Sequence, residues 1–243
     1  MYGVTMAKPA RVLGLYPNSG DNEPNASEES MELFLVGEIA HACALYNDPT
    51  RHYHNWLHIT KCLALVEKLD LDKKTKFFLS VSFLYHDAIY IPGMESEKLS
   101  KRLLSSRLMQ LQRNHPFNGS FFSAIGWICP NLILLKEDLA KKYPDFAEQY
   151  AGLKSLFDDI DYAILGADWG EYKRYVEGVK KEYLNWCTEA EFWAGRNAWL
   201  NNLRCKPYIF ENAKTSVLFH KLEEQAQKNI RDEYNLIHPI AAK

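Results

Sequence analysis

The stretch FFLSVSFLYHDAIY at residues 77–90 decides what this chain can fold into. Residues 77–85 carry no charge and are mostly large and apolar, which is typical of a helix buried in a core. His86 and Asp87 follow directly. A buried carboxylate is unfavourable unless it is paired or coordinates a metal, and a divalent cation satisfies Asp87 and a neutral imidazole together. We therefore expect a buried helix over residues 73–91 that presents two metal ligands.

The segments around this stretch also follow the period of an α-helix. Helices are expected at about residues 28–46, 54–69, 95–114 and 118–128, with breaks at Asp70, Pro92-Gly93 and Pro116. The first of these helices has an apolar stripe formed by Leu33, Val36, Ile39, Ala40 and Cys43. A later stripe comprises Tyr172, Tyr175, Val176, Val179, Tyr183 and Trp186, and a capping box is formed by Thr188 and Glu191. Strand patterns are nearly absent, so the expected fold is all-α, a helical bundle.

Length and composition favour one helical domain. The chain has 243 residues, of which 47% are hydrophobic, and this is enough to bury a single sizeable core. Residues 17–30 are polar and rich in Gly, Pro, Asn and Ser, a composition that does not order itself. We therefore expect a flexible N-terminal segment at residues 1–26 and one helical domain at residues 27–243.

Charge, hydropathy and cysteine content exclude several classes of protein. The 29 basic and 31 acidic residues leave a net charge of −2, so there is no strong nucleic-acid signal and no basic field for an anionic membrane. The longest apolar run is shorter than the roughly 18 residues that span a bilayer, and no secretory signal is recognisable. The five cysteines are scattered without C-x-x-C spacing, which indicates reduced thiols in the core of a cytoplasmic protein.

Two further segments carry chemistry. In RHYHNWLHI at residues 51–59, His54 and His58 are four residues apart and share one face if the segment is helical, although such a pair is also common on a solvated face. In FDDIDYAILG at residues 157–166, three carboxylates crowd against an apolar turn. Such crowding is repulsive without a cation, but aspartates also cap helix N-termini. One aspartate is therefore expected to bind a metal and another to cap a helix.

Together the three segments resemble the HD superfamily of metal-dependent phosphohydrolases, in which a His is followed by a His-Asp pair and then by a distant Asp. More narrowly, the chain is similar to a bacterial family of HD-type phosphohydrolases with three characteristic segments, which read here as RHYHNWLHI, YHDAIY and DDIDYAILG. The resemblance covers about residues 32–232 and implies an HD-domain-like helical bundle.

The resemblance also implies the metal ligands. His58, His86 and Asp87 would bind the ion together with a later aspartate. For that position Asp161 is favoured over Asp159, because an Asp before a bulky residue and Ala continues the helix as in the related phosphodiesterase cores. The mixed nitrogen and oxygen donors suit Mn, Mg, Co, Ni, Fe or Zn and do not choose between them.

Three further residues are candidates for catalysis. The segment around His54 is similar to that of cyclic-nucleotide phosphodiesterases, which implies that His54 is the proton donor. Arg51 is a candidate for holding the phosphate, although a structural ion pair explains it equally well. Glu97 and Ser100 retain part of the family's N-E-x-x-S segment, whose Asn is missing here. The segment of this chain that corresponds to the family's I-x-x-T-x-x-H has neither the Thr nor the His, and Asn131 stands at the His position. This weighs against a second metal or a substrate contact there.

The expected function is therefore hydrolysis of a phosphomonoester or phosphodiester by a metal-activated water. The expected partner is a small phosphorylated substrate, a nucleotide or another phosphate ester, and a homo-oligomer is left open. The main alternative is an inactive regulatory HD protein that binds metal or nucleotide. Two others are a di-iron enzyme of oxygen chemistry, which needs more ligands, and a plain helical scaffold, which binds no metal.

Overall fold

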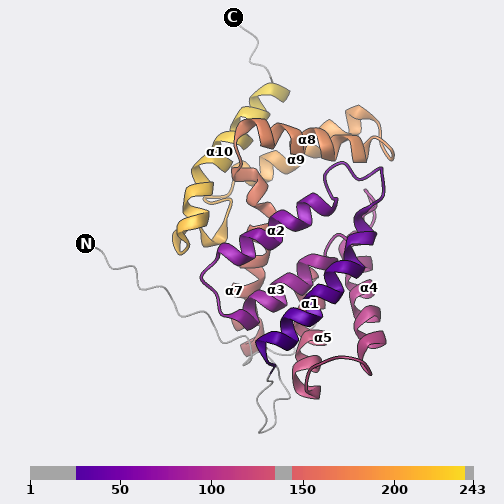
Figure 1. The fold of residues 1–243 in the computed structure, drawn as a ribbon. Helices are drawn as coiled ribbons and strands as arrows, with labels where there is room; N and C mark the ends of the chain where they lie inside the picture. Colours follow the sequence, from indigo (N-terminus) through magenta and orange to yellow (C-terminus); the bar gives the residue numbers. More distant parts are fainter. Residues whose placement is uncertain (1–25, 135–143, 239–243) are drawn as a thin grey trace, which may run out of the picture. The chain divides into compact units, whose positions relative to one another are not determined.

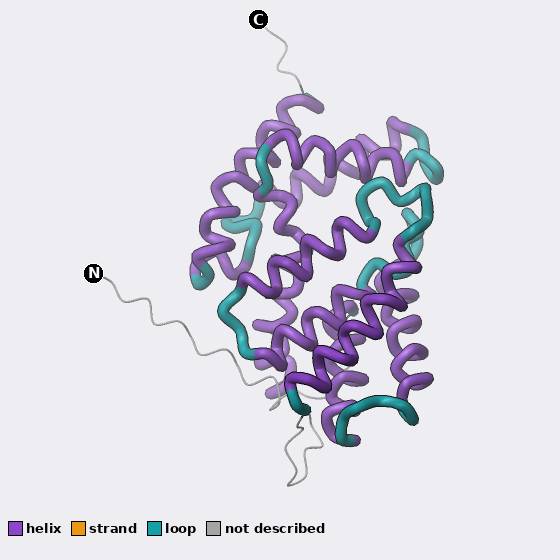
Figure 2. Tube along the Cα trace, in the orientation of Figure 1, coloured by secondary structure: helices purple, strands orange, loops and turns teal. Residues whose placement is uncertain are grey.

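The computed structural model describes residues 26–134 and 144–238, and this part of the chain consists of helices and loops without a strand (Figure 2). The all-α fold expected from the sequence is confirmed. The flexible segment expected at residues 1–26 lies outside the described residues except for its last position. None of the described helices is both long enough and apolar enough to cross a membrane.

The helices group into two compact units. The N-terminal unit contains α1 (Glu28–Cys43), η2 (Ala44–Tyr46), α2 (Trp56–Lys68), α3 (Lys73–Tyr85), α4 (Ser96–Leu111), α5 (Gly119–Ile133) and most of α7 (Pro144–Asp161). The C-terminal unit contains Thr50–Tyr53, the end of α7, η3 (Tyr162–Gly166), α8 (Trp169–Tyr183), α9 (Glu189–Arg204), η4 (Glu211–Lys214) and α10 (Val217–Ile237). The single domain expected over residues 27–243 stays a prediction.

Helix α3 is the core of the N-terminal unit. Every residue from 77 to 85 is buried, and α3 contacts α1, α2, α4 and α5 (Figure 1). The ring of Phe77 lies 5.7–5.8 Å from those of Phe34, Phe117 and Phe121. Burial of one such ring contributes roughly 1.5–3 kcal/mol, so this aromatic cluster holds α1, α3 and α5 together.

Helix α3 ends at Tyr85, six residues before the end at residue 91 that the sequence predicts. His86 is its C-cap, and the ring Nδ1 of His86 lies 3.0 Å from the carbonyl oxygen of Phe83. In a continuing helix this carbonyl would accept from the amide of Asp87. Here the side chain of His86 bonds to this carbonyl instead, and the backbone leaves the helical path at Asp87.

Two other helix ends differ from the expected ones. Helix α2 begins at Trp56 because the side chain of Asn55 caps it, accepting from the amide of Leu57 at 3.0 Å. His54 therefore precedes the helix. Helix α5 continues through Pro130 to Ile133, and its last turns are buried. Burial outweighs the hydrogen bond lost at Pro130.

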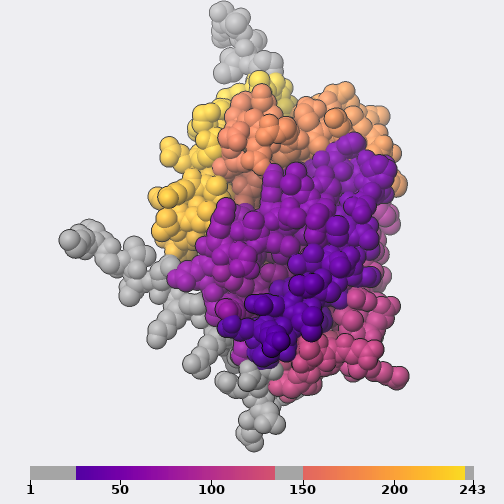
Figure 3. Space-filling model, in the orientation of Figure 1, coloured from indigo at the N-terminus to yellow at the C-terminus, as the bar shows by residue number. Residues whose placement is uncertain are grey.

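The apolar stripe expected to be the core face of α1 is mostly exposed. Leu33 and Val36 are 66% and 64% exposed, and Figure 3 shows α1, in indigo, at the surface of its unit. The buried face consists of Met31, Phe34, Glu38 and Ala42. Period alone cannot decide between two apolar faces, and the aromatic ring of Phe34 together with the ion pair of Glu38 decides it here.

In the C-terminal unit, α10 contacts η3, η4 and α9. Gly166 of η3 lies so close to α10 that a Cβ there would approach Leu222 to 2.7 Å. The side chain of Asn229, which is fully buried, donates to the carbonyls of Leu165 and Ala167, both at 2.8 Å. The capping box of Thr188 and Glu191 is confirmed. These contacts fix the chain just after the end of α7.

The apolar stripe expected after residue 170 is confirmed for its first part. Tyr172, Val176 and Val179 are buried in α8, whereas Trp186 lies beyond the helix and is 63% exposed. All five cysteines are free. Cys62 and Cys129 are buried, but Cys205 is exposed, so the expectation of core thiols holds only for some of them.

Candidate metal centre

Two buried imidazoles and a carboxylate converge in the N-terminal unit. His58 lies in the first turns of α2, and its Nε2 is 3.1 Å from Nε2 of His86 at the end of α3. The Oδ2 atom of Asp87 lies 3.0 Å from Nε2 of His86 and 3.6 Å from Nε2 of His58. Both imidazoles are about 5% exposed, so water competes little for these atoms.

The hydrogen bond of His86 to Phe83 uses Nδ1 and leaves Nε2 to face His58 and Asp87. A carbonyl oxygen has no proton, so Nδ1 of His86 is the donor. In the neutral ring Nε2 is then an acceptor, and it faces an acceptor oxygen of Asp87 at 3.0 Å. The two atoms attract each other only through a cation between them or through a proton on Nε2. The backbone carbonyl thus plays the part that outer partners of metal-binding histidines commonly play.

The turn that carries Asp87 is held by two serines of α4. The hydroxyl of Ser100 bonds both the amide and the carbonyl of Ile89 at 3.0 Å. The hydroxyl of Ser96 does the same to Ile91, at 3.0 and 3.1 Å. These bonds replace the helical hydrogen bonds lost after Tyr85. Ser96 and Ser100, which belong to the segment compared above with N-E-x-x-S, therefore have a structural role.

Helix α7 brings a second carboxylate. The ring of Phe157 stacks on Phe83 with centroids 4.3 Å apart and meets the ring of His86 edge-on. Asp161 lies four residues further along the same helix and therefore on the same face. One ligand atom from each of His58, His86, Asp87 and Asp161 lies within 4.8 Å of the other three. The structure thus brings together the four residues that the sequence favours as ligands.

These separations fit a single divalent ion. Ligand atoms about 2.1 Å from an ion lie about 3.0 Å apart at right angles and about 3.4 Å apart at tetrahedral angles. The three contacts among His58, His86 and Asp87 measure 3.0, 3.1 and 3.6 Å. The distances among these three residues are close to those of ligand atoms around one ion, and the donors do not identify the metal.

Asp159, the other candidate for the fourth ligand, has a different role. It is 3% exposed, and its carboxylate accepts from the amides of Glu211 and Asn212 at 3.0 and 2.7 Å and from the Asn212 side chain at 2.9 Å. Burial raises the pKa of this carboxyl above its usual range, against the opposing effect of these hydrogen bonds. Asp159 ties α7 to η4, and it does not belong to the cluster.

The proposed catalytic residues lie in different places. The ring of His54 is 6.1 Å from that of His58 and stacks on Tyr90 with centroids 3.7 Å apart. Glu97 is exposed in the first turn of α4 and is not among the clustered residues. Arg51 is half-buried in the loop before α2, within the C-terminal unit. Of the three, His54 is the one that the structure places beside the cluster's histidines.

Two contacts are not predicted from the sequence. Tyr90 supports the ring of His54, and its place at the end of the H-D-A-I-Y segment was an available signal. Asn131, which stands where the family that the sequence resembles has a histidine, is buried and accepts from the ammonium of Lys101 at 2.7 Å. Lys101 also donates to the carbonyl of Leu134 at 2.7 Å. The position is filled by a polar network that ends α5, and nothing in the sequence pairs Lys101 with it.

The chain matches no protein-family model, no curated protein and no solved structure.

Proposed function

We propose that the protein is a metal-dependent phosphohydrolase of the HD type, acting on a nucleotide or another small phosphate ester. The observation that carries the proposal is the convergence of buried ligand atoms: Nε2 of His86 lies 3.0 Å from the Asp87 carboxylate and 3.1 Å from a second imidazole, and Asp161 completes the cluster. Such a set is costly to bury unless a cation joins it. The order of the three sequence segments supports the assignment to HD-type chemistry.

In this proposal His58, His86, Asp87 and Asp161 hold the ion. On a six-coordinate ion the four protein ligands would leave two positions for water and substrate, unlike the closed four-coordinate shell of a structural zinc site. When bound, the ion supplies a Lewis acid for a phosphoryl oxygen and lowers the pKa of a coordinated water. The buried walls of the site keep competing solvent away from the ligands and fix their orientation.

His54 is proposed as the acid that donates a proton to the leaving oxygen. Its ring lies beside the ligands without belonging to them. The stack on Tyr90 restricts the ring to one plane, and a protonated imidazole is attracted to the face of a phenol ring. Arg51 is proposed to hold the phosphate, because a guanidinium binds phosphate oxygens in a bidentate manner. The free cysteines are consistent with a reducing compartment, and we propose the cytoplasm.

The test begins with elemental analysis of the chain purified without chelator and after reconstitution with Mn²⁺. About one metal per chain is expected, and His86→Ala and Asp87→Ala should lose it. His220→Ala is the matched control, because His220 is an exposed histidine outside the cluster. A wild-type chain that binds no ion after reconstitution with Mn, Mg, Co, Ni, Fe or Zn would contradict the proposal.

Turnover is then measured with p-nitrophenyl phosphate, bis(p-nitrophenyl) phosphate and a nucleotide panel in the presence of each metal. Replacement of His54 by Ala should keep the metal and lower kcat by roughly 100-fold or more, the usual contribution of a general acid. Full metal content without turnover on any substrate would favour the alternative, a regulatory protein that binds metal or nucleotide.

A further inference from the structure

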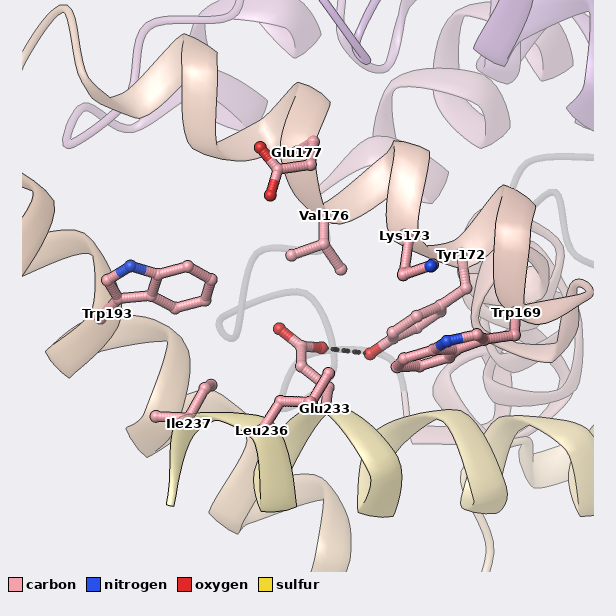
Figure 4. A pocket seen from close by; sticks show the side chains of 9 residues that line it. All are labelled: Trp169, Tyr172, Lys173, Val176, Glu177, Trp193, Glu233, Leu236 and Ile237. Atoms are coloured by element: carbon pink, nitrogen blue, oxygen red, sulfur yellow. Dashed lines mark hydrogen bonds between the residues drawn. The ribbon is translucent and has the colours of Figure 1, made fainter. Parts of the chain in front are cut away.

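The C-terminal unit has a pocket of about 540 Å³ that shares no residue with the metal cluster (Figure 4). It is formed by α8, α9 and α10, and Figure 4 shows the indoles of Trp169 and Trp193 on opposite sides of it. Apolar side chains, among them Val176 and Ile237, line the space between them. Its volume falls in the range of about 300–1,000 Å³ that is typical of sites for small molecules.

Both indoles are held in place. Trp169 stacks on Tyr172 at a centroid distance of 5.6 Å and an interplanar angle of 17°. The Nε1 atom of Trp193 donates to Glu189 at 3.2 Å, and its ring meets Phe192 edge-on at 5.0 Å. Rings that are fixed before a ligand arrives lose little entropy on binding. The two indole walls are therefore fixed before a ligand binds.

The floor of the pocket is electrically neutral. Glu233, which is 4% exposed, receives two hydrogen bonds from Arg196 at 2.9 Å and one from the hydroxyl of Tyr172. Its charge is thus matched by the guanidinium, and its acceptor atoms are occupied. An organic cation would find no free charge at this depth.

Two charges of opposite sign line the pocket from α8. Lys173 and Glu177 are exposed and four residues apart, one turn along the same face. Within the described part of the chain, neither side chain forms a hydrogen bond or an ion pair, and Nζ of Lys173 lies 5.8 Å from the centre of the Trp169 ring. The pocket therefore offers one free donor group and one free acceptor group beside its aromatic walls.

We propose that this pocket binds the base of a nucleoside or nucleotide. A nucleobase is planar, stacks on indole faces, and carries acceptors and donors together on its edge, which suits the ammonium of Lys173 and the carboxylate of Glu177. An alkyl chain would leave both charges beside hydrocarbon. For a quaternary ammonium ion, repulsion by Lys173 would offset the attraction of Glu177, and such an ion has no acceptor for the Lys173 ammonium. The pocket shares no residue with the proposed metal ligands and does not include His54, so this proposal does not depend on the proposed function.

The test uses 2-aminopurine riboside, whose fluorescence is quenched when it stacks on indole. Titration with the full chain should give saturable quenching, and adenosine or guanosine should reverse it. Trp193→Ala should weaken binding by about tenfold or more, the usual effect of removing a stacking ring. Trp186→Ala is the matched control, because Trp186 is 63% exposed and does not line the pocket. Titrations with and without added Mn²⁺ should give the same affinity, which separates this pocket from the metal centre.

Two less disruptive variants guard against misfolding. Lys173→Met and Glu177→Gln alter exposed side chains of α8, and each should weaken binding about threefold or more while the circular dichroism stays unchanged. Absence of saturable quenching would overturn the proposal. So would displacement of the probe by octyl glucoside but not by nucleosides, or equal affinity of the wild type and Trp193→Ala.

Discussion

His86 performs two tasks with its two ring nitrogens. Nδ1 takes the carbonyl of Phe83 and ends α3, while Nε2 faces Asp87 and His58. Adjacent residues in a continuing helix point about 100° apart and cannot address one point. Because the helix ends at this residue, His86 and Asp87 turn their side chains toward each other. The same side chain therefore ends the helix and forms one half of the ligand pair.

The two aspartates near the end of α7 should respond differently to the loss of a charge. Asp161→Asn removes a carboxylate ligand and should lower metal affinity by about tenfold or more, with little effect on stability, because Asp161 is only half-buried. Asp159→Asn should keep the metal and lower the free energy of unfolding by roughly 1–3 kcal/mol, because one of the two oxygens that serve three donors becomes an NH2 group, which cannot accept from them. Metal titration and urea unfolding of both variants measure this.

The opposite pattern would contradict the assignment: a stable Asp159→Asn chain that loses its metal would make Asp159 the ligand. The sequence narrows the choice to these residues but cannot make it. Three carboxylates in four positions indicate a cation or a cap, whereas the donors that claim Asp159 lie at Glu211 and Asn212, more than fifty positions later. Only the fold brings these donors to it.

At the scale of single helices, α1 offers the clearest stability test. Phe34→Ala should lower the free energy of unfolding by about 3–5 kcal/mol, since the ring is 7% exposed and packs on Phe77 and Phe117. The neighbouring Leu33→Ala should change it by less than about 0.5 kcal/mol, as for other surface positions. Urea unfolding of the two variants compares adjacent residues of one helix.

A larger effect for Leu33→Ala than for Phe34→Ala would mean that the core lies on the other face. The sequence predicts the existence of the helices well, because apolar positions at helical spacing and breaks at Pro92-Gly93 and Pro116 are local signals. It predicts their ends less well. The start of α2 depends on the rotamer of Asn55, and the end of α3 depends on the ring of His86.

At the scale of the whole molecule, both units contain a buried glutamate held by an arginine and a tyrosine. In the N-terminal unit, Glu38 accepts from Tyr85 at 2.5 Å and from Arg107 at 2.8 and 3.1 Å. In the C-terminal unit, Glu233 accepts from Tyr172 and Arg196. A buried pair adds little net stability, but removal of one partner leaves a charge uncompensated. Each network therefore fixes which helix faces meet.

The same networks predict how stability depends on alkaline pH. Burial, reinforced by the neighbouring glutamate, raises the pKa of Tyr85 and that of Tyr172 far above their usual range, and burial also raises the pKa of Tyr175. A group whose pKa is higher in the folded state stabilises the fold fully below its unfolded pKa, near 10 for tyrosine, and loses that contribution as pH rises above it. Above pH 10, Tyr85 and Tyr172 should each lower the free energy of unfolding by up to about 1.4 kcal/mol per pH unit, and Tyr175 should add to the loss.

Urea unfolding between pH 9 and 11.5, with tyrosinate absorbance followed at 295 nm, measures this loss. Because lysines also titrate in this range, the slope is compared with that of Tyr85→Phe for the N-terminal unit and Tyr172→Phe for the C-terminal unit. Each variant should lose about 1.4 kcal/mol per pH unit of the slope, and the absorbance of the remaining buried tyrosines should rise only together with unfolding. Ionisation of Tyr85 or Tyr172 in the folded chain near pH 10 would show that water reaches the hydroxyl. Water would then also reach the neighbouring glutamate, and the glutamate would not need the arginine to compensate its charge.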